Sequence, residues 1–282
     1  KMDIVIITPS LHYGGGAEKL VEFHARELSR RGHKITVYCI IDEGGIGGVL
    51  RRHGIKVINL QCFKALKNLY RAEAKTKRLY KVTRFLNEIA ASFRLAGIFL
   101  NAKPDVVHLY QNTTKMAILV SKICGVKKII YTETSLIGDW LSPMQLSVMR
   151  IFLRSCDNII ALSSSMKDQM LKLKLADDSK ICVIPSMFSL PESDGYYTDK
   201  KPCSFPIRIG TVGKLAPEKG HVYFLEAANL ILKQMDGVTF IIAGYGILRE
   251  QLEALSKKLE IAEKVEFTGK FEDIRDIMER ID

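Results

Sequence analysis

The chain has 282 residues, 47% hydrophobic and 26% charged, a composition that allows packed cores and excludes a disordered or low-complexity protein. Of the net charge of +11, residues 1–188 hold 29 Lys and Arg against 15 Asp and Glu, whereas residues 189–282 hold 13 against 16. Six scattered cysteines without a C-x-x-C pair exclude a disulfide framework and favour reduced, buried thiols in a cytosolic protein. We expect no targeting or transmembrane segment, because Arg94 and Lys122 interrupt long apolar runs.

Short apolar runs alternate with amphipathic stretches in residues 1–188. Strands are expected at 3–8, 34–41, 57–60, 105–110, 128–132, 158–162 and 179–184, helices at 17–31, 114–124, 143–156 and 165–173, and one or two helices within 64–100. Within 64–100, Val82, Leu86, Ile89 and Phe93 have the spacing of the apolar side of a helix, with Lys and Arg on its other face. The repeated β–α–β order predicts a parallel sheet covered on both faces.

A second α/β unit is expected at 207–282. Residues 190–206 contain three prolines and lack periodicity, which predicts a linker at 189–206 after a first domain at 1–188. The second unit has expected strands at 207–212, 238–243 and 264–268 and helices at 220–235, 247–260 and 272–281. An open sheet normally has more strands (roughly five or six), so this domain is expected to be incomplete.

The stretch 213–220 (G-K-L-A-P-E-K-G) stands between an apolar strand and an amphipathic helix. Backbone N–H groups at a helix N-terminus, with Lys214 and Lys219 beside them, suit a phosphate group. We interpret the stretch as a cradle for a diphosphate, although it lacks the P-loop order and an ordinary strand–helix turn is the alternative.

A second glycine-bearing loop, Gly14-Gly15-Gly16, follows the first strand and opens a helix that carries Glu18. Glycines there allow a ligand to approach the backbone closely. Two alternatives remain open: a purely structural loop, and a dinucleotide fold with Asp42 or Glu43 as the ribose partner.

Together these motifs resemble those of family 4 of the retaining glycosyltransferases, which have the GT-B fold of two Rossmann-like parallel-sheet domains. The chain matches the family at 213–220 (G-R-L-x-x-E-K-G), at 14–18 (G-G-x-E), at 244–252 (G-x-G-P-x-R-x-x-L, with Ile247 for Pro) and at 265–269 (V-x-F-x-G). The resemblance implies that Lys214 and Lys219 hold the donor diphosphate, that Gly15, Gly16, Gly244 and Gly246 contact the donor, and that Lys270 and Phe271 meet its nucleobase.

Three departures from the family pattern stand out. Thr134 occupies the position of a His that touches the transferred sugar, and Ser186-Met187 replaces the N-G of a P-N-G motif. The E-x7-E motif is missing after Gly269, so the chain as given is expected to bind donor poorly and to catalyse nothing by itself. His12, next to the glycine loop, is the candidate for the missing polar contact, or is an ordinary loop residue.

We therefore predict a retaining glycosyltransferase that moves a sugar from a nucleoside-diphosphate sugar to a lipid-linked or polysaccharide acceptor, without metal or other cofactor. Its catalytic candidates are Lys214, Lys219, Thr134 and His12, and His108 is either an acceptor contact or a core residue.

Residues 61–103 hold ten basic and two acidic side chains, which predicts attraction to an anionic membrane, here its inner face. The alternative for these basic side chains is an ordinary solvated helix face. The alternative functions are a sugar-nucleotide epimerase and a non-catalytic nucleotide-sugar or membrane-binding module; aromatic residues are not interleaved as nucleic-acid binding requires.

Overall fold

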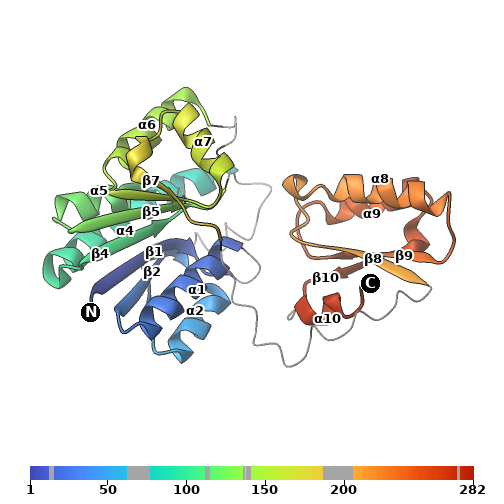
Figure 1. The fold of residues 1–282 in the computed structure, drawn as a ribbon, viewed down its shortest axis with the longest axis horizontal. Helices are drawn as coiled ribbons and strands as arrows, with labels where there is room; N and C mark the ends of the chain where they lie inside the picture. The colour runs from blue at the N-terminus through green and yellow to red at the C-terminus, as the bar shows by residue number, and fades with distance from the viewer. Residues whose placement is uncertain are drawn as a thin grey trace. The chain divides into compact units, whose positions relative to one another are not determined.

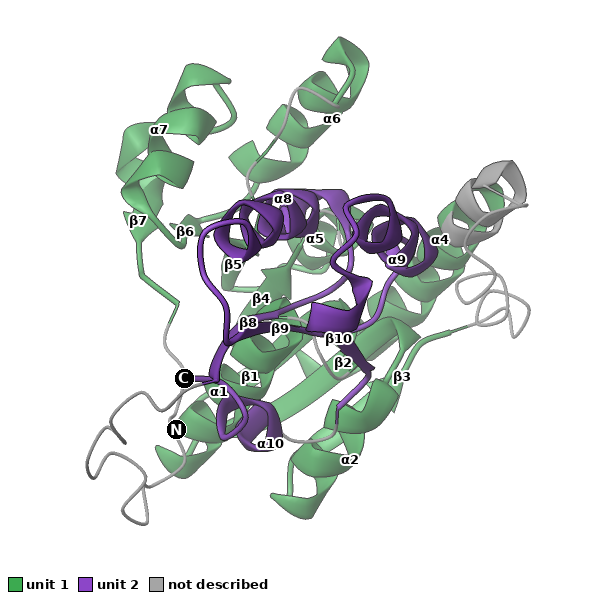
Figure 2. Cartoon of the chain, turned by 90° about the vertical axis from the view of Figure 1, so that its right-hand side faces the viewer, with its two compact units in different colours: residues 1–190 green, residues 191–282 purple. Residues whose placement is uncertain are grey.

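The structure is a computed structural model that describes residues 1–12, 16–61, 77–111, 115–135, 137, 141–186, 206–271 and 274–282. The chain forms two compact units, residues 1–190 and 191–282, coloured green and purple in Figure 2. The predicted linker at 189–206 lies outside the described residues except for Pro206, so its boundaries stay a prediction.

The first unit is built on a seven-stranded parallel sheet in the order β3-β2-β1-β4-β5-β6-β7. Its strands are β1 (Asp3–Ser10), β2 (Lys34–Asp42), β3 (Lys56–Asn59), β4 (Val106–Tyr110), β5 (Lys128–Glu133), β6 (Asn158–Ala161) and β7 (Ile181–Val183). Nearly continuous apolar runs form these strands because both faces of the sheet are covered. The predicted parallel α/β sheet is confirmed.

Helices cover the two faces unequally (Figure 1). On one face lie α1 (Gly16–Arg30) and α2 (Gly44–Arg52); on the other lie α4 (Lys77–Ala102), α5 (Lys115–Ile123), α6 (Pro143–Arg154) and α7 (Ser164–Lys172). Leu20, Val21 and Leu50 pack into the core on the first face, and Phe99 and Met149 into the core on the second. The helices change face because the strand order reverses between β1 and β4.

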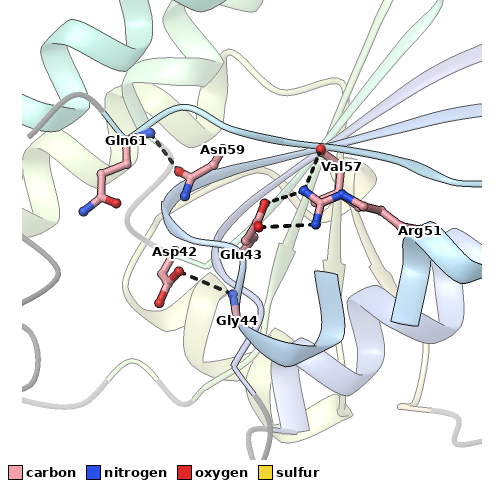
Figure 3. A network of polar contacts seen from close by, with 7 residues as sticks. All are labelled: Asp42, Glu43, Gly44, Arg51, Val57, Asn59 and Gln61. Atoms are coloured by element: carbon pink, nitrogen blue, oxygen red, sulfur yellow. Dashed lines mark hydrogen bonds and ion pairs between the residues drawn. The ribbon is translucent and has the colours of Figure 1, made fainter. Parts of the chain in front are cut away.

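The pattern of residues did not predict α2, whose sequence GGIGGVLRR is rich in a poor helix former. The helix forms because Ile46 and Leu50 are fully buried against the sheet. Arg51 secures it further with two hydrogen bonds to Glu43, at 3.2 and 2.5 Å, and one to the carbonyl of Val57 (Figure 3). Tertiary packing overrides local propensity here.

The orientation of α4 differs from what its strongest apolar stripe suggests. Val82, Leu86 and Phe93 are exposed, and the helix buries a different side, with Ala91, Leu95 and Phe99 in the core. Asn87 on that inner side is fully buried and donates a hydrogen bond of 2.8 Å to the carbonyl of Ile40. Residues 62–76, which include the start of the predicted helix, lie outside the described part of the chain.

The second unit has a three-stranded parallel sheet in the order β10-β9-β8, formed by β8 (Ile207–Val212), β9 (Val238–Ala243) and β10 (Val265–Gly269). Its helices are α8 (His221–Leu232), α9 (Arg249–Lys258) and α10 (Ile274–Met278). Leu225, Phe240 and Leu252 form its core between the sheet and the helices α8 and α9. All three predicted strands are confirmed within one residue.

The described cysteines are free thiols, as predicted, but not all are buried. Burial raises the pKa of Cys39 and raises that of Cys156 to about 12, which keeps both protonated and unreactive. Cys182 is exposed, contrary to the expectation of a buried thiol, because its strand β7 is at the edge of the sheet.

Candidate functional site

The stretch 213–220 of the second unit connects β8 to α8, in the predicted order of strand, loop and helix. A short 3-10 turn spans Pro217–Lys219, and Gly220 then adopts a left-handed conformation with φ of 68° before α8 begins. A glycine reaches this conformation without steric cost. Since Gly220 has no side chain to accept them, the first N–H groups of α8 stay available to an anion.

Backbone hydrogen bonds join the three loops that follow the strands of the second unit. Gly213 N donates to the carbonyl of Ala243 at 2.9 Å, and Leu215 N donates to that of Tyr245 at 3.0 Å. Gly244 N donates to the carbonyl of Gly269 at 3.1 Å. The carboxyl ends of β8, β9 and β10 therefore carry one connected platform, at the edge where parallel α/β sheets bind ligands.

Gly244 and Gly246 have a packing role in this platform. A Cβ atom on Gly244 would lie 1.8 Å from the carbonyl oxygen of Gly213, and one on Gly246 would lie 2.3 Å from that of Leu215. The two glycines thus let neighbouring loops touch backbone to backbone. Their predicted contact with a donor stays a prediction.

Both candidate lysines are exposed at this edge of the sheet. The stem of Lys219 lies over Gly213, with its Cδ 3.9 Å from where a Cβ atom of that glycine would be. Among the described residues neither lysine forms an ion pair, so both charges are open to a ligand. Lys270 is exposed and Phe271 half-buried directly after β10, on the same platform.

His221 positions the loop that carries Lys214. Its ring is buried, and Nε2 lies 3.1 Å from the carbonyl oxygen of Lys214. Because a carbonyl only accepts, Nε2 carries the proton, which leaves Nδ1 as a buried acceptor with no partner among the described residues. No motif in the sequence marked this positioning residue; the available signal was a His directly after the glycine that opens a helix.

Arg249, part of the G-x-G-P-x-R resemblance, braces α9 against β10. Its Nε lies 2.6 Å from a carboxylate oxygen of Glu253, and its Nη2 donates to the carbonyl of Phe267 at 3.3 Å. The guanidinium carbon lies 5.6 Å from the centre of the Phe267 ring. Contacts inside the unit thus engage this arginine on three sides.

In the first unit, the strand order reverses between β1 and β4, which marks the usual ligand crevice of an open sheet. His12 follows β1, half-exposed, and its Nε2 lies 3.1 Å from a carboxylate oxygen of Asp42. Gly16 opens α1 with free space around it, whereas Gly15 lies outside the described residues. Gln111, directly after β4, has a φ of 64°, a left-handed conformation that a non-glycine residue adopts at some energetic cost. No sequence signal marked it.

Thr134 follows β5 and is half-buried, and its position depends on the preceding residue, Glu133. The Glu133 carboxylate is buried and accepts hydrogen bonds from the Tyr131 hydroxyl at 2.8 Å and from the N–H groups of Thr134 and Ser135 at 3.0 and 3.3 Å. Burial raises the pKa of Glu133, and these donors partly offset that shift. Glu133 therefore fixes the loop that carries Thr134.

We expect Glu133→Ala to destabilise this loop by roughly 2 kcal/mol, because it leaves several buried donors without an acceptor. Glu133→Gln keeps an accepting oxygen and should cost less than about 1 kcal/mol. Hydrogen exchange of a peptide covering residues 128–135 measures both effects, with Asp168→Ala on the exposed side of α7 as the control. Equal exchange in the wild type and Glu133→Ala would contradict this role.

His108 is a core residue in a buried polar chain. Its Nε2 lies 2.7 Å from the Thr132 hydroxyl, its Nδ1 lies 3.3 Å from the Tyr110 hydroxyl, and that hydroxyl also contacts Nδ1 of His24. Burial, together with the neighbouring His24, lowers the pKa of His108 to about 3, so its ring is neutral. Of the two interpretations left open by the sequence, the core residue is the one the structure supports.

The part of the chain that the structure describes holds no cluster of three or more potential metal ligands. None of its helices combines the length and the apolar character needed to cross a bilayer. The structure therefore assembles Lys214, Lys219, Gly244, Gly246, Lys270 and Phe271 in the second unit, and places His12, Gly16 and Thr134 at the carboxyl ends of strands in the first.

Comparison with known proteins decides the family. The sequence profile of Glycosyltransferase Family 4 matches residues 14–189, more than half of the chain. The chain belongs to glycosyltransferase family 4. The profile described as Glycosyl transferases group 1 matches residues 206–282, so sugar transfer is the reaction class of both matched families.

Among similar proteins is the GalNAc-alpha-(1->4)-GalNAc-alpha-(1->3)-diNAcBac-PP-undecaprenol alpha-1,4-N-acetyl-D-galactosaminyltransferase of Campylobacter jejuni, 26% identical over 281 residues, which are 99% of this chain and 71% of that protein. The GPI3 subunit of phosphatidylinositol N-acetylglucosaminyltransferase from Saccharomyces cerevisiae is 22% identical over 273 residues, 92% of this chain. The chain spans 57% of the length of that subunit.

The fold also matches solved glycosyltransferase structures. Anabaena Alr3699/HepE, solved with UDP and glucose, aligns with a TM-score of 0.74 at 18% identity, over 100% of this chain and 73% of that one. WaaG, a glycosyltransferase involved in lipopolysaccharide biosynthesis, aligns with a TM-score of 0.66 at 14% identity, over 99% and 73%. The predicted GT-B fold class is confirmed.

Proposed function

We propose that this chain takes part in retaining transfer of a sugar from a nucleoside-diphosphate sugar to a lipid-linked or polysaccharide acceptor. The observation that carries the proposal is the platform of the second unit. There, two exposed lysines and the uncapped N-terminus of α8 meet at the carboxyl edge of a parallel sheet. A diphosphate matches that concentration of positive charge and free N–H groups.

The similar proteins support both substrates. The Campylobacter jejuni relative is named for an undecaprenyl-diphosphate-linked acceptor, and Anabaena HepE was solved with UDP and glucose. We infer a nucleoside-diphosphate donor of the same chemical class for this chain. Its acceptor would lie at an anionic membrane surface, to which the basic segment 61–103 is attracted.

The chemical demand on the site is to stabilise the departing diphosphate. Lys214 and Lys219 would offset the negative charge that develops on the β-phosphate as the glycosidic bond breaks, and the α8 dipole would add to them. The departing phosphate oxygen would take the proton of the acceptor hydroxyl. This chemistry involves no metal ion, which we propose as a property of the reaction.

Lys219→Ala tests the donor site. Loss of one charge-assisted contact should weaken binding of the best nucleoside diphosphate by about 1.5–3 kcal/mol, roughly 10- to 100-fold. Isothermal titration calorimetry with UDP, GDP and ADP measures the change. The control is Lys233→Ala, which removes an exposed lysine at the other end of α8 and should leave affinity unchanged.

Equal affinity in the wild type and Lys219→Ala would remove this lysine from the site, and binding weakened as much by Lys233→Ala as by Lys219→Ala would contradict the donor site itself. Incubation with nucleotide sugar alone separates the remaining alternatives. An epimerase alters the donor sugar without an acceptor. A transferase alters the donor only when an acceptor is also present, and a non-catalytic module leaves the donor unchanged in both cases.

A further inference from the structure

Large apolar side chains gather on the outer sides of three neighbouring helices of the first unit. They are Val82, Phe85, Leu86, Phe93 and Leu100 on α4, Leu119 and Ile123 on α5, and Met144, Val148 and Ile151 on α6. Three of them expose about three quarters of their surface: Phe93 at 76%, Ile123 at 75% and Met144 at 74%. We call this set the α4–α6 face.

The three helices form one layer. In that layer α5 packs between α4 and α6, all three on the same face of the sheet (Figure 1). Each helix has its inner side in the core, through residues such as Phe99, Ile118 and Met149. The exposed side chains recur at helical spacing, seven apart at positions 86, 93 and 100 and three or four apart at 144, 148 and 151. They therefore line the side of the layer that points away from the sheet.

Core packing does not account for this face, because the inner sides of the helices already supply the core. Scattered exposed apolar residues are ordinary, but an array across three adjacent helices marks an interaction surface. The apolar side of α4, which sequence periodicity alone would turn towards the core, belongs to this surface.

The charge of the three helices indicates what kind of partner binds to the α4–α6 face. The sequences of α4, α5 and α6 together contain nine Lys and Arg and a single acidic residue, Glu88. Lys122 and Arg154 are exposed beside the apolar side chains. Two copies of a layer with this excess of positive charge would repel each other, whereas a surface that is anionic at its headgroups and apolar beneath them complements both the charge of the layer and its exposed apolar side chains.

We propose that the α4–α6 face docks on a bilayer of anionic phospholipids, with Phe93, Ile123 and Met144 entering the boundary between headgroups and acyl chains. The helices lie in the plane of the interface, since no described helix is long and apolar enough to cross it. The inference rests on the proposed function for the location of the acceptor. Its test uses neither donor nor acceptor, so the two fail independently.

Vesicle flotation tests the docking. The chain should float with phosphatidylglycerol–phosphatidylcholine vesicles, and less with phosphatidylcholine alone or at high salt, because salt screens the attraction. The triple variant Phe93→Ser/Ile123→Ser/Met144→Ser should lower the partition coefficient about tenfold or more, because interfacial binding scales with buried apolar area. The control Tyr223→Ser/Leu230→Ser/Met278→Ser removes exposed apolar residues of the second unit and should bind as the wild type does.

Insertion is read separately with Phe93→Trp in a Trp140→Phe background, so that the native tryptophan does not contribute; its fluorescence should be quenched by brominated lipids, while that of Tyr223→Trp in the same background is not. Circular dichroism confirms that each variant is folded. Failure of the wild type to float, or unchanged flotation of the triple variant, would overturn the proposal. So would sedimentation showing a dimer that Phe93→Ser disperses while vesicle binding persists, because the face would then join two copies of the chain.

Discussion

Substitution of Gly244 by alanine should destabilise the second unit by roughly 3–5 kcal/mol. The new Cβ atom would lie 1.8 Å from the carbonyl oxygen of Gly213, and the backbone at Gly244 has a φ of 146°, a conformation that side chains rarely adopt. Either the loops after β8 and β9 separate or the strands shift. Separation of these loops would break the hydrogen bond from Gly213 N to the carbonyl of Ala243.

Gly213→Ala is the matched control for this variant. A Cβ atom on Gly213 would meet only the flexible stem of Lys219, at 3.9 Å, so its effect on stability should stay below about 1 kcal/mol. Hydrogen exchange of peptides covering β8, β9 and β10 reads the second unit alone. Similar protection in Gly244→Ala and Gly213→Ala would show that the close approach of the two loops does not hold the platform together.

Acidification should destabilise the first unit through its buried histidines. The pKa of His108 is about 3 in the folded chain, against 6.5 for an unperturbed His, and burial also lowers the pKa of His24. Below pH 6.5 the unfolded chain therefore binds protons that the folded chain excludes, so stability is full above that pH and falls as the pH drops. His108 alone should contribute a loss of roughly 2.5 kcal/mol between about pH 7 and about pH 4.5.

Urea unfolding at a series of pH values, followed by a probe in the first unit, measures this loss. Glu133 acts in the opposite direction, because its raised pKa lets the folded chain take up a proton before the unfolded chain does. Comparison with His108→Asn cancels that contribution and should show a shallower loss of stability in acid. His53→Asn, at an exposed position, should keep the wild-type slope; equal slopes in all three proteins would refute the buried neutral His108.

His108 and the platform belong to different units, so substitutions at the two places should destabilise different parts of the chain. The platform lies in the second unit, whereas the polar chain from His24 through Tyr110 to His108 lies inside the first. A variant of one unit that altered exchange only in that unit would confirm that the two compact units have separate cores.

Local sequence patterns were sufficient to predict an element where a single interaction, such as burial of apolar side chains, determines it. Apolar runs bounded by Gly and Pro identified the strands of both sheets, because a strand buried on both faces has no polar positions to confuse the pattern. The order of strand, lysine-bearing loop and helix at 213–220 was likewise readable, since Gly220 and the apolar periodicity after it mark a helix start. The resemblance to glycosyltransferase family 4 was likewise recognised from short local motifs such as residues 213–220.

Contacts between distant residues decided the rest. The sequence by itself determined the parallel α/β class, the two-unit organisation and the position of the cationic loop, all of which follow from short-range periodicity and turn chemistry. Only the tertiary structure decided that α2 forms from a glycine-rich segment, that Gly244 serves loop packing, and that α4 turns Phe93 to solvent. The physical reason is that side-chain burial depends on which neighbours a fold brings together, and one helix can offer two apolar sides of which the sheet covers only one.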